Sequence, residues 1–323
     1  MKRQYVIGAD LGGTQIRSCL ADAQGRVLRE SHQATMAQEG LQPVMGRIKE
    51  TLHRVADDVS PDEVLGIGMG SPGPLDPQTG VVVEAANLPG WKNVPLRDIL
   101  MQEFHVPVWV NNDANAAALA EHRFGAGRGY SDLIYLTIST GIGGGFICGG
   151  KLLLGTHGFA GEPGHITVEP NGPRCNCGNI GCLEALAAGP AIARRATELI
   201  RAGEHSTLET AVLPGQQLTA EMVGRAAQQE DAVALQAVQR AANYLGIGIL
   251  NLIHLFDPAV VILGGGVSKL GDLLFVPVRE LVRERGITLQ QRETPIVPAE
   301  LGDMVGLLGG VALVLMNLET ESA

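Results

Sequence analysis

Three of the five cysteines lie in one short stretch, CNCGNIGC, which runs from Cys175 through Cys177 to Cys182. His165 precedes the first of them by ten residues. One imidazole and three thiolates make a complete tetrahedral ligand set, as structural zinc sites use. A disulfide between Cys175 and Cys177 would close a strained ring, and other pairings need an oxidising compartment. We therefore expect these four residues to bind a structural zinc ion.

A second group of polar residues, NNDAN at positions 111–115, follows a predicted strand and opens a predicted helix. In open α/β sheets, ligands bind at this end of the strands. One carboxylate among amides suits a hydroxylated substrate, because amides bind hydroxyls while Asp113 can act as a general base. A helix cap is the alternative, but a cap needs only one such residue. The pattern favours a catalytic site.

The segment DLGGT, residues 10–14, is a glycine turn between two predicted strands. Gly12 and Gly13 permit a sharp reversal in which backbone N–H groups and the Thr14 hydroxyl point into one concavity. Asp10 ends the first strand, where it could hold Mg²⁺ directly or through water. Taken alone, the segment is explained equally well by an ordinary hairpin.

Two further glycine turns are STGIGGG at 139–145 and LGGG at 263–266. A dinucleotide-binding fingerprint would need a helix directly after the first of these, but residues 146–148 predict a strand. The second turn would let a planar ring or a ribose approach the backbone, although a tight strand-to-helix turn is also common there. Two hydroxyl-bearing glycine hairpins in one chain favour a phosphate clamp.

The predicted elements must position these segments. Apolar runs predict a first series with strands at 5–10, 16–21, 27–35, 64–70 and 107–110 and helices at 41–57 and 115–123. A second series has strands at 132–139, 144–148, 151–155 and 259–263 and helices at 190–202, after Thr219, and at 231–254. The order predicts mixed sheets with helices on their faces and a faint duplication of a half-domain. Residues 203–217 are expected to form a surface loop.

The composition is that of an ordinary soluble globular protein, with 323 residues, 45% hydrophobic and 18% charged. This length allows two domains. A net charge of −10 argues against a general nucleic-acid binder. The N-terminus reaches Asp10 too soon for a signal peptide, and polar residues interrupt the apolar stretch 241–256, which predicts a buried helix. We expect a cytoplasmic protein with no membrane or nucleic-acid partner.

Together these segments resemble the ROK family of repressors and sugar kinases, within the actin-like ATPase superfamily. The resemblance covers essentially the whole chain and is most specific at GEPGHITVEPNGPRCNCGNIGCLEALAAG, residues 161–189. It implies an α/β, actin-like (ribonuclease H-like) fold of two domains with a cleft between them. The smaller domain, with the first phosphate loop and the base, is expected at 1–118 plus a C-terminal helix at about 305–323. The larger, with the zinc site, is expected at 119–304.

The resemblance implies ATP-dependent phosphorylation of a hexose on its 6-hydroxyl, with Asp113 as general base. The residues that would bind the sugar are Gly73, Asn87, Asn112, Asp113, Glu162, His165 and Glu184. Those that would bind ATP and Mg²⁺ are Asp10, Gly12, Gly13, Thr14, Thr140, Gly141, Gly143, Gly264, Gly265 and Gly266. The resemblance also implies that zinc is bound by His165, Cys175, Cys177 and Cys182.

Within the family, the unbroken set of sugar loops is most similar to the glucokinases. Mannose, fructose or N-acetylmannosamine as acceptor, and polyphosphate as a second donor, stay open, because the pockets for these sugars overlap. A sugar-sensing repressor would need a helix-turn-helix ahead of this fold, and the first strand begins at about Tyr5. The resemblance also implies a homodimer or homotetramer.

Overall fold

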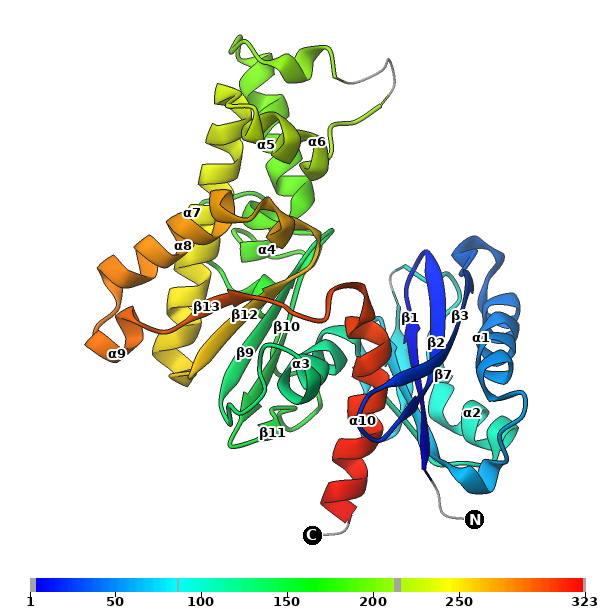
Figure 1. Cartoon of the computed structure of the whole chain (residues 1–323). Helices are drawn as coiled ribbons and strands as arrows, with labels where there is room; N and C mark the ends of the chain where they lie inside the picture. Colours follow the sequence, from blue (N-terminus) through cyan, green and yellow to red (C-terminus); the bar gives the residue numbers. More distant parts are fainter. Residues whose placement is uncertain (1–3, 86, 212–215, 322–323) are drawn as a thin grey trace. The chain divides into compact units, whose positions relative to one another are not determined.

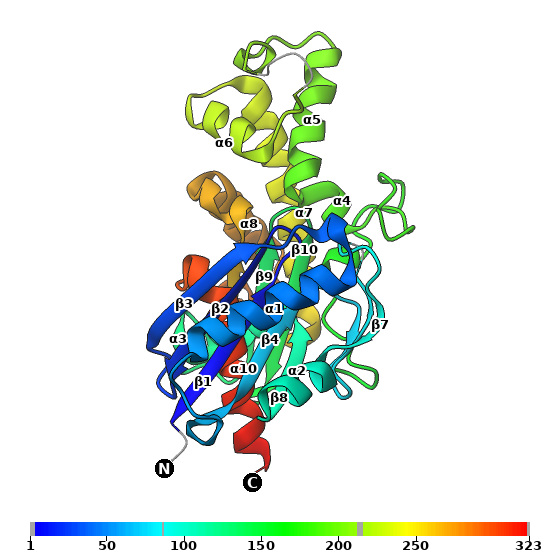
Figure 2. The ribbon, with the colours of Figure 1, turned by 90° about the vertical axis from the view of Figure 1, so that its right-hand side faces the viewer.

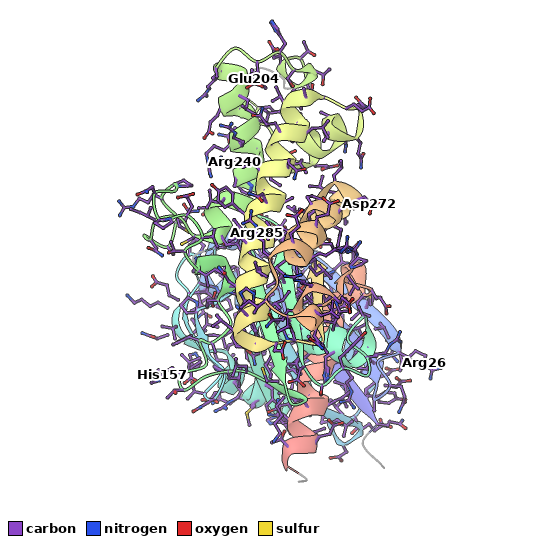
Figure 3. All side chains as sticks on the ribbon, turned by 90° about the vertical axis from the view of Figure 1, so that its left-hand side faces the viewer. Arg26, His157, Glu204, Arg240, Asp272 and Arg285 are labelled. Atoms are coloured by element: carbon purple, nitrogen blue, oxygen red, sulfur yellow. The ribbon has the colours of Figure 1, made fainter. Side chains whose placement is uncertain are left out.

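The computed structural model describes residues 4–85, 87–211 and 216–321, which form two compact units (Figure 1). Unit 1 comprises Met1–Gly129, Gly145–Gly161 and Glu300–Ala323, and unit 2 comprises Tyr130–Gly144 and Glu162–Ala299. The chain therefore crosses between the units four times. The charged side chains of Arg26, Glu204 and Arg285 project from the surface (Figure 3).

Unit 1 is built on a five-stranded mixed sheet with the order β3-β2-β1-β4-β8. Its strands are β1 (Tyr5–Leu11), β2 (Gln15–Asp22), β3 (Val27–Ala34), β4 (Val64–Ser71) and β8 (Val108–Asn112). The first three are antiparallel, whereas β1, β4 and β8 run parallel. The mixed sheet predicted from the apolar runs is confirmed, because these runs are buried while β3 alternates between half-buried and exposed residues.

Helices cover both faces of this sheet. On one face lie α1 (Leu41–Ala56) and α2 (Leu96–Phe104), whose apolar residues join the sheet in one core cluster (Figure 2). The other face packs against α10 (Val305–Glu321), which also contacts α3 (Asp113–Phe124). The contact between α10 and the sheet is backbone against backbone, since a Cβ at Gly68 in β4 would lie 1.9 Å from the carbonyl oxygen of Gly310. Glycines thus let α10 lie directly on the strands.

The segment Gly302–Thr320 is long and apolar enough to span a membrane by length and composition, the one helix of this kind in the part of the chain that the structure describes. Packing explains its apolar character. Leu307, Val311 and Val314 are at most 2% exposed and belong to a cluster with β1 and β2 residues. The segment is therefore a core helix of unit 1.

A small three-stranded sheet in unit 1 has no counterpart among the predicted elements. It consists of β5 (Leu75–Asp76), β6 (Val81–Glu84) and β7 (Lys92–Pro95) in that order. The connection from β6 to β7 carries Asn87 and ends at Trp91, which is 2% exposed. The strands are too short to show a period of two, which explains why the sequence pattern did not predict them.

The second large sheet has the order β11-β10-β9-β12-β13. Its strands are β9 (Leu133–Ile138), β10 (Ile142–Cys148), β11 (Lys151–Leu152), β12 (Val260–Gly264) and β13 (Ile296–Pro298), and β12 runs parallel to β9 and β13. The division between the units passes through β10, after Gly144. The strand predicted at 151–155 is shorter than expected, because the chain leaves the ladder after Leu152.

The helices of unit 2 pack around α7 (Ala232–Phe256), whose N-terminus is capped by Asp231. Its contacts are α4 (Leu183–Ala187), α5 (Gly189–Arg201), α6 (Ala220–Gln228) and α8 (Asp272–Arg285). The buried helix predicted from this apolar stretch is confirmed, since thirteen of its residues are buried. The helix α8 and the short α9 (Leu289–Arg292) were not predicted. The predicted loop at 203–217 contains a 3-10 turn at Thr207–Glu209, and residues 212–215 lie outside the described chain.

The division into units follows elements that run without a break. Helix α3 is continuous from Asp113 to Phe124, so the domain boundary expected at residue 118 falls inside it, whereas unit 1 extends to Gly129. The segment Gly145–Gly161 also belongs to unit 1. The expected domain limits remain a prediction about the folding units of the chain.

Candidate functional site

The four predicted zinc ligands converge in unit 2. One ligand atom from each of His165, Cys175, Cys177 and Cys182 lies within 4.8 Å of all the others. Cys175 Sγ is 3.8 Å from His165 Nδ1, and Cys177 Sγ is 3.7 Å from Cys182 Sγ. Three sulfurs and one imidazole nitrogen fit the tetrahedral coordination of a structural zinc ion. The site therefore has the donor set that the sequence predicts.

A tight turn brings the cysteines together. The N–H of Gly178 donates to the carbonyl of Cys175 at 3.0 Å, and the N–H of Cys175 donates to the carbonyl of Asn179 at 2.8 Å. Gly178 and Gly181 have φ of 94° and 70°, which L side chains rarely adopt. A Cβ at Gly181 would also lie 1.6 Å from the carbonyl oxygen of Glu169. The glycines within CNCGNIGC are thus required for the turn.

The three thiols differ in their ease of ionisation. Burial raises the pKa of Cys182 to about 12 and also raises the pKa of Cys175. The backbone N–H of Asn179, by contrast, lowers the pKa of Cys177. The thiols of Cys175 and Cys182 therefore stay neutral at pH 7 unless a cation stabilises their thiolates, which is what a bound metal ion does.

Glu184 lies two residues after Cys182, in the first turn of α4. Its Oε2 accepts a hydrogen bond from the N–H of Ile142 at 3.0 Å, and Cys175 Sγ donates to Oε1 at 3.7 Å. Ile142 belongs to the turn STGIGGG. A carboxylate predicted to bind sugar thus also contacts both the cysteine cluster and a predicted phosphate loop.

Glu162 directly precedes the 3-10 turn that carries His165. Much of its side chain is accessible, yet partial desolvation raises the pKa of its carboxyl, an effect that the nearby His165 opposes and the negative charge of Glu184 reinforces. Two carboxylates and an imidazole therefore share one region of unit 2. Together they offer both hydrogen-bond donors and acceptors, as recognition of sugar hydroxyls needs.

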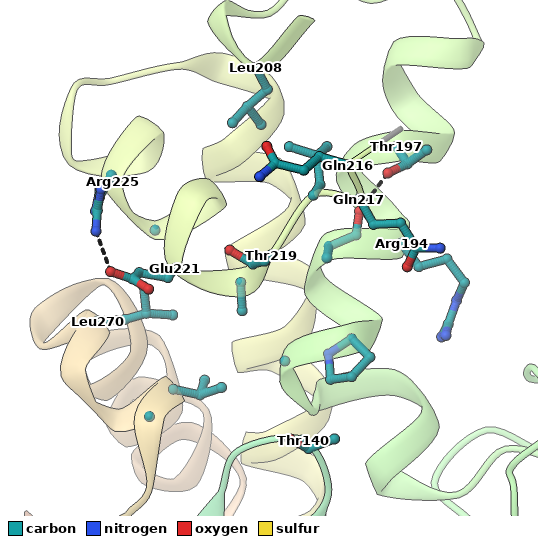
Figure 4. Close-up of a pocket in the computed structure, with 18 of the residues that line it drawn as sticks. Thr140, Arg194, Thr197, Leu208, Gln216, Gln217, Thr219, Glu221, Arg225 and Leu270 are labelled. Carbon is teal, nitrogen blue, oxygen red and sulfur yellow. Dashed lines mark hydrogen bonds and ion pairs between the residues drawn. The ribbon is translucent and has the colours of Figure 1, made fainter. Parts of the chain in front are cut away.

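A cavity of about 1430 Å³ lies among the helices of unit 2 (Figure 4). Its wall includes Ser139 and Thr140 of one glycine turn and Gly266 of another. Most of the remaining wall comes from α5, α6 and the 3-10 helix Gly266–Leu270, with polar residues that include Arg194, Thr197, Glu221 and Arg225. Two turns that the sequence associates with ATP thus border one cavity. Of the residues predicted to bind ATP in unit 2, Thr140 and Gly266 line it, and Gly141, Gly143, Gly264 and Gly265 lie in the same two turns.

The backbone of these turns is fixed by close contacts. Gly265 has φ of 83°, and a Cβ there would lie 2.4 Å from the carbonyl oxygen of Ile138. In the other turn, Ser139 donates through its N–H to Gly141 O at 2.9 Å and accepts from the N–H of Gly189 at 2.8 Å. A Cβ at Gly141 would lie 2.5 Å from Glu184 Oε2. Glycine is therefore needed at position 265, whereas a side chain at position 141 would have to displace the Glu184 carboxylate.

In unit 1, the polar run 111–115 spans the end of β8 and the start of α3. Asn112 is the N-cap, since its Oδ1 accepts from the N–H groups of Ala114 and Asn115 at 2.9 and 3.4 Å. The capping alternative therefore holds for Asn112. Asp113 is exposed, and its Oδ1 accepts from the N–H of Ala114 at 2.8 Å.

Strand register brings Asp10 and Asp113 to the same edge of the unit 1 sheet. Asp10 pairs with Gly70 across β1 and β4, and Gly70 pairs with Asn111 across β4 and β8. A Cβ at Gly70 would lie 3.5 Å from Asp113 Cα and 3.8 Å from Asp10 Oδ1. Gly70 thus lies between the Asp10 carboxylate and the backbone of Asp113, at the carboxyl ends of parallel strands, where α/β proteins bind ligands.

The DLGGT turn is held by its neighbours. Asp10 Oδ2 accepts from Arg17 Nη2 at 2.7 Å, an ion pair that sequence reasoning missed. The Thr35 hydroxyl donates to Gly12 O at 2.6 Å, and the N–H of Thr35 donates to Thr14 O at 2.8 Å. The turn that is predicted to bind phosphate is thus anchored at its backbone carbonyls.

Two predicted sugar residues of unit 1 lie close to these segments. A Cβ at Gly13 would lie 3.4 Å from Asn87 Cβ, and a Cβ at Gly73 would lie 3.4 Å from Asn112 Nδ2. The first juxtaposition places Asn87 beside the DLGGT turn, and the second places Gly73 beside the capping Asn112. Unit 1 therefore gathers all of its predicted site residues at one edge of its sheet.

The cavity wall is what sequence reasoning did not find. Its residues on α5 and α6 are separated by nineteen positions or more and follow no motif. One signal was present in the sequence: Gly224, in the middle of α6, lies on the wall, and a Cβ there would be 2.5 Å from Leu270 Cδ2. A glycine inside a helix often marks such a close approach.

Known proteins resemble the chain along its whole length. It is 38% identical to a glucokinase of Thermotoga maritima over 97% of this chain and 98% of that one. It is 36% identical to a xylose repressor of Caldicellulosiruptor bescii, covering 97% of this chain but 78% of the repressor. A ROK family glucokinase from Streptomyces griseus, solved with glucose and AMPPNP, matches with a TM-score of 0.79, 36% identity and coverage of 96% and 98%.

These matches bear on both fold and family. The likeness to a solved ROK kinase, together with two units built on mixed α/β sheets, confirms the expected α/β, actin-like ATPase fold. The model of the ROK family matches residues 6–317 of this chain, nearly its full length. The chain therefore belongs to the ROK family.

Proposed function

We propose that the chain is a glucokinase, which transfers the γ-phosphoryl group of Mg-ATP to the 6-hydroxyl of glucose. The observation that carries this proposal is the position of Asp113, exposed at the end of β8 and across Gly70 from Asp10. A base and a second carboxylate at one sheet edge are what phosphorylation of a hydroxyl requires. The glucokinase of Thermotoga maritima and the ROK glucokinase solved with glucose and AMPPNP support the same activity.

Asp113 acts as the general base in this proposal. It accepts the proton of the sugar 6-hydroxyl while that oxygen bonds to the γ-phosphorus and the bond to the ADP oxygen breaks. The hydrogen bond from the N–H of Ala114 holds Asp113 Oδ1, which fixes the direction of the carboxylate. Glucose 6-phosphate and ADP are the products.

Asp10 is the residue that would hold Mg²⁺, directly or through water. Its Oδ2 forms an ion pair with Arg17, which holds the carboxylate in place. A bound Mg²⁺ supplies positive charge that stabilises the charge developing on the phosphate oxygens. Gly12, Gly13 and Thr14 supply backbone N–H groups and a hydroxyl for the same purpose.

In unit 2, the cavity is proposed to bind the adenosine side of ATP. Its size suits a nucleotide, and Thr140 supplies a hydroxyl beside the turn that binds phosphate. Gly141 and Gly143 belong to that turn, whereas Gly264, Gly265 and Gly266 let the nucleoside approach the backbone closely. The ATP contacts of unit 2 therefore come from two turns that border one cavity.

The sugar hydroxyls are proposed to be bound by Gly73, Asn87, Asn112 and Asp113 of unit 1 and by Glu162, His165 and Glu184 of unit 2. Zinc on His165, Cys175, Cys177 and Cys182 would hold the imidazole in place. A metal-bound thiolate has no proton to donate, so binding of zinc to Cys175 would leave Glu184 Oε1 available to a hydroxyl. Zinc is thus a structural support for recognition.

An assay that couples both products to detection tests the proposal. With Mg-ATP and glucose, the protein should release ADP and form glucose 6-phosphate in equal amounts. Equal release of ADP without glucose would show ATP hydrolysis instead. Polyphosphate as donor, and specific binding of operator DNA, are the outcomes that would favour the alternatives. The second is included because a xylose repressor is among the relatives.

Location and assembly are also proposals. Three thiols close enough for metal binding need a reducing compartment, which supports a cytoplasmic location. We propose a homodimer or homotetramer, supported by large apolar side chains that unit 2 leaves exposed, among them Leu255 at 74%, Ile287 at 75% and Leu289 at 64%. Sedimentation equilibrium measures the mass of the assembly.

A further inference from the structure

The carboxylate of Glu121 is buried in unit 1 and bound by backbone N–H groups. Its side chain is 0% exposed. Oε2 accepts from the N–H of Ala126 at 2.8 Å and of Glu300 at 3.2 Å, and Oε1 accepts from the N–H of Leu301 at 3.0 Å. None of the ion pairs found among residues 4–85, 87–211 and 216–321 includes Glu121. Three peptide N–H groups therefore stabilise its negative charge.

These N–H groups belong to two of the four connections between the units. Ala126 precedes the point at which the chain leaves unit 1, after Gly129. Glu300 is the first residue of unit 1 after the chain returns from unit 2. One side chain thus fastens an outgoing and a returning segment to the same helix.

The surrounding sequence is adapted to this contact. A Cβ at Gly125 would lie 2.1 Å from Glu121 Oε2, so no other residue fits there without moving the carboxylate. The carbonyl of Glu121 accepts from the N–H groups of Gly125 and Gly127 at 3.1 and 2.9 Å. On the surface, Arg128 forms an ion pair with Glu300 at 3.2 Å, which joins the same two segments.

Glu121 and Asp113 lie on one helix. Helix α3 begins at Asp113 and carries Glu121 near its other end. A helix of twelve residues transmits position well, because its hydrogen bonds all lie within the segment. The position of the last turns of α3 relative to the two connections therefore also determines the position of Asp113.

We propose that Glu121 is a positioning residue, which fastens both connections to the helix that carries the base. We call Glu121 with the N–H groups of Ala126, Glu300 and Leu301 the clamp. Displacements of the two connections beyond these contacts would then leave Asp113 in place. The role in turnover rests on the proposed function, whereas the clamp itself does not.

A carboxylate is needed for chemical reasons. Glutamine has one acceptor oxygen, and its NH₂ group would face an N–H donor in either orientation. Leaving buried N–H groups without a partner costs about 1–3 kcal/mol, which corresponds to about 5- to 150-fold in a local opening equilibrium. Glu121→Gln should therefore loosen the connections while it keeps the shape of the side chain.

The experiment combines hydrogen exchange with kinetics on the full chain. In Glu121→Gln, peptides that contain Ala126, Glu300 and Leu301 should exchange about tenfold faster than in the wild type. We expect kcat for glucose phosphorylation to fall about tenfold, while the Kd for ADP, measured by calorimetry, changes less than twofold. Arg123→Ala is the matched control, because it removes an exposed ion pair with Glu319 from the same helix without contacting either connection. It should leave exchange at the three amides and kcat unchanged.

Gly125→Ala is the second variant, because its Cβ displaces the carboxylate while every hydrogen-bonding group is kept. It should reproduce both effects, and it decides the matter if Glu121→Gln fails to fold. Unchanged exchange at the three amides in the folded variants would overturn the clamp. Faster exchange with wild-type kcat, or an equal loss of kcat and of ADP affinity, would overturn the positioning role. A wild-type protein without kinase activity would instead refute the proposed function. The hydrogen-exchange rates of the three amides would still test whether Glu121 holds the two connections.

Discussion

The Oε2 atom of Glu184 accepts a hydrogen bond from the backbone N–H of Ile142 at 3.0 Å. This contact joins α4, which follows directly on Cys182, to a glycine turn whose first residues line the cavity of unit 2. The cysteine cluster and the proposed ATP loop are therefore linked by one carboxylate. A change at the cluster should consequently alter the KM values for both glucose and ATP.

Loss of one thiolate tests this link. Cys177→Ser should lower the zinc content, measured by plasma mass spectrometry, from one ion per chain to a small fraction, because three ligands hold zinc weakly. KM for glucose should rise about tenfold or more through loss of support for His165, in line with the effect of altered metal-site residues. KM for ATP should rise by a smaller factor through Glu184.

Cys148→Ser is the control for this variant, since Cys148 lies outside the cluster. It should retain zinc and both KM values. An undiminished glucose affinity in a zinc-free Cys177→Ser sample would show that the cluster does not support the sugar contacts.

The third glycine turn offers a separate test of the nucleotide cavity. Gly265→Ala introduces a Cβ 2.4 Å from Ile138 O at a residue with φ of 83°. The turn must shift, so KM for ATP should rise about tenfold, the kinetic equivalent of about 1.4 kcal/mol. KM for glucose should stay within twofold of the wild type.

Gly203→Ala separates the effect of the positive φ from the effect of the close contact of the added Cβ. Gly203 has φ of 94°, but a Cβ there meets nothing within 4 Å. This variant should lose a little thermal stability and keep both KM values. An unchanged KM for ATP in Gly265→Ala would remove this turn from the nucleotide site.

The base is tested by Asp113→Asn. Asparagine keeps an oxygen that can accept from the N–H of Ala114, so the helix start and glucose binding should be retained. Turnover should fall by about 10²- to 10⁴-fold, because the amide cannot accept the proton of the 6-hydroxyl. Single-turnover kinetics together with calorimetry of glucose binding separate the two effects.

Asp98→Asn provides the comparison, because Asp98 also lies in the first turn of a helix, α2, and is not among the residues proposed to bind sugar or ATP. Its kcat should equal that of the wild type. A wild-type rate in Asp113→Asn would mean that Asp113, like Asn112, serves only the start of α3.

Local patterns predicted much of this molecule, and the reason is physical. Apolar runs such as β1 and β4 are buried strands, and glycine turns follow them because positive φ or close contacts demand glycine, as at Gly265. The convergence of His165 with the three cysteines could also be predicted, since the spacing of metal ligands is local.

What the sequence did not reveal depends on contacts between distant segments. Glu184 meets Ile142 across 42 positions, and Glu121 meets Glu300 across 179. Both partners are backbone N–H groups, which carry no sequence signal. The cavity wall on α5 and α6 likewise exists only after the helices of unit 2 pack around α7.

The central claim is that this chain phosphorylates glucose with ATP. The most direct test is kcat/KM for glucose, mannose, fructose and N-acetylmannosamine under saturating Mg-ATP, with ADP release as the common readout. The account predicts the highest kcat/KM for glucose, with glucose 6-phosphate formed in equal amount to ADP. A clearly higher kcat/KM for any other sugar, or no sugar-dependent release of ADP, would contradict it.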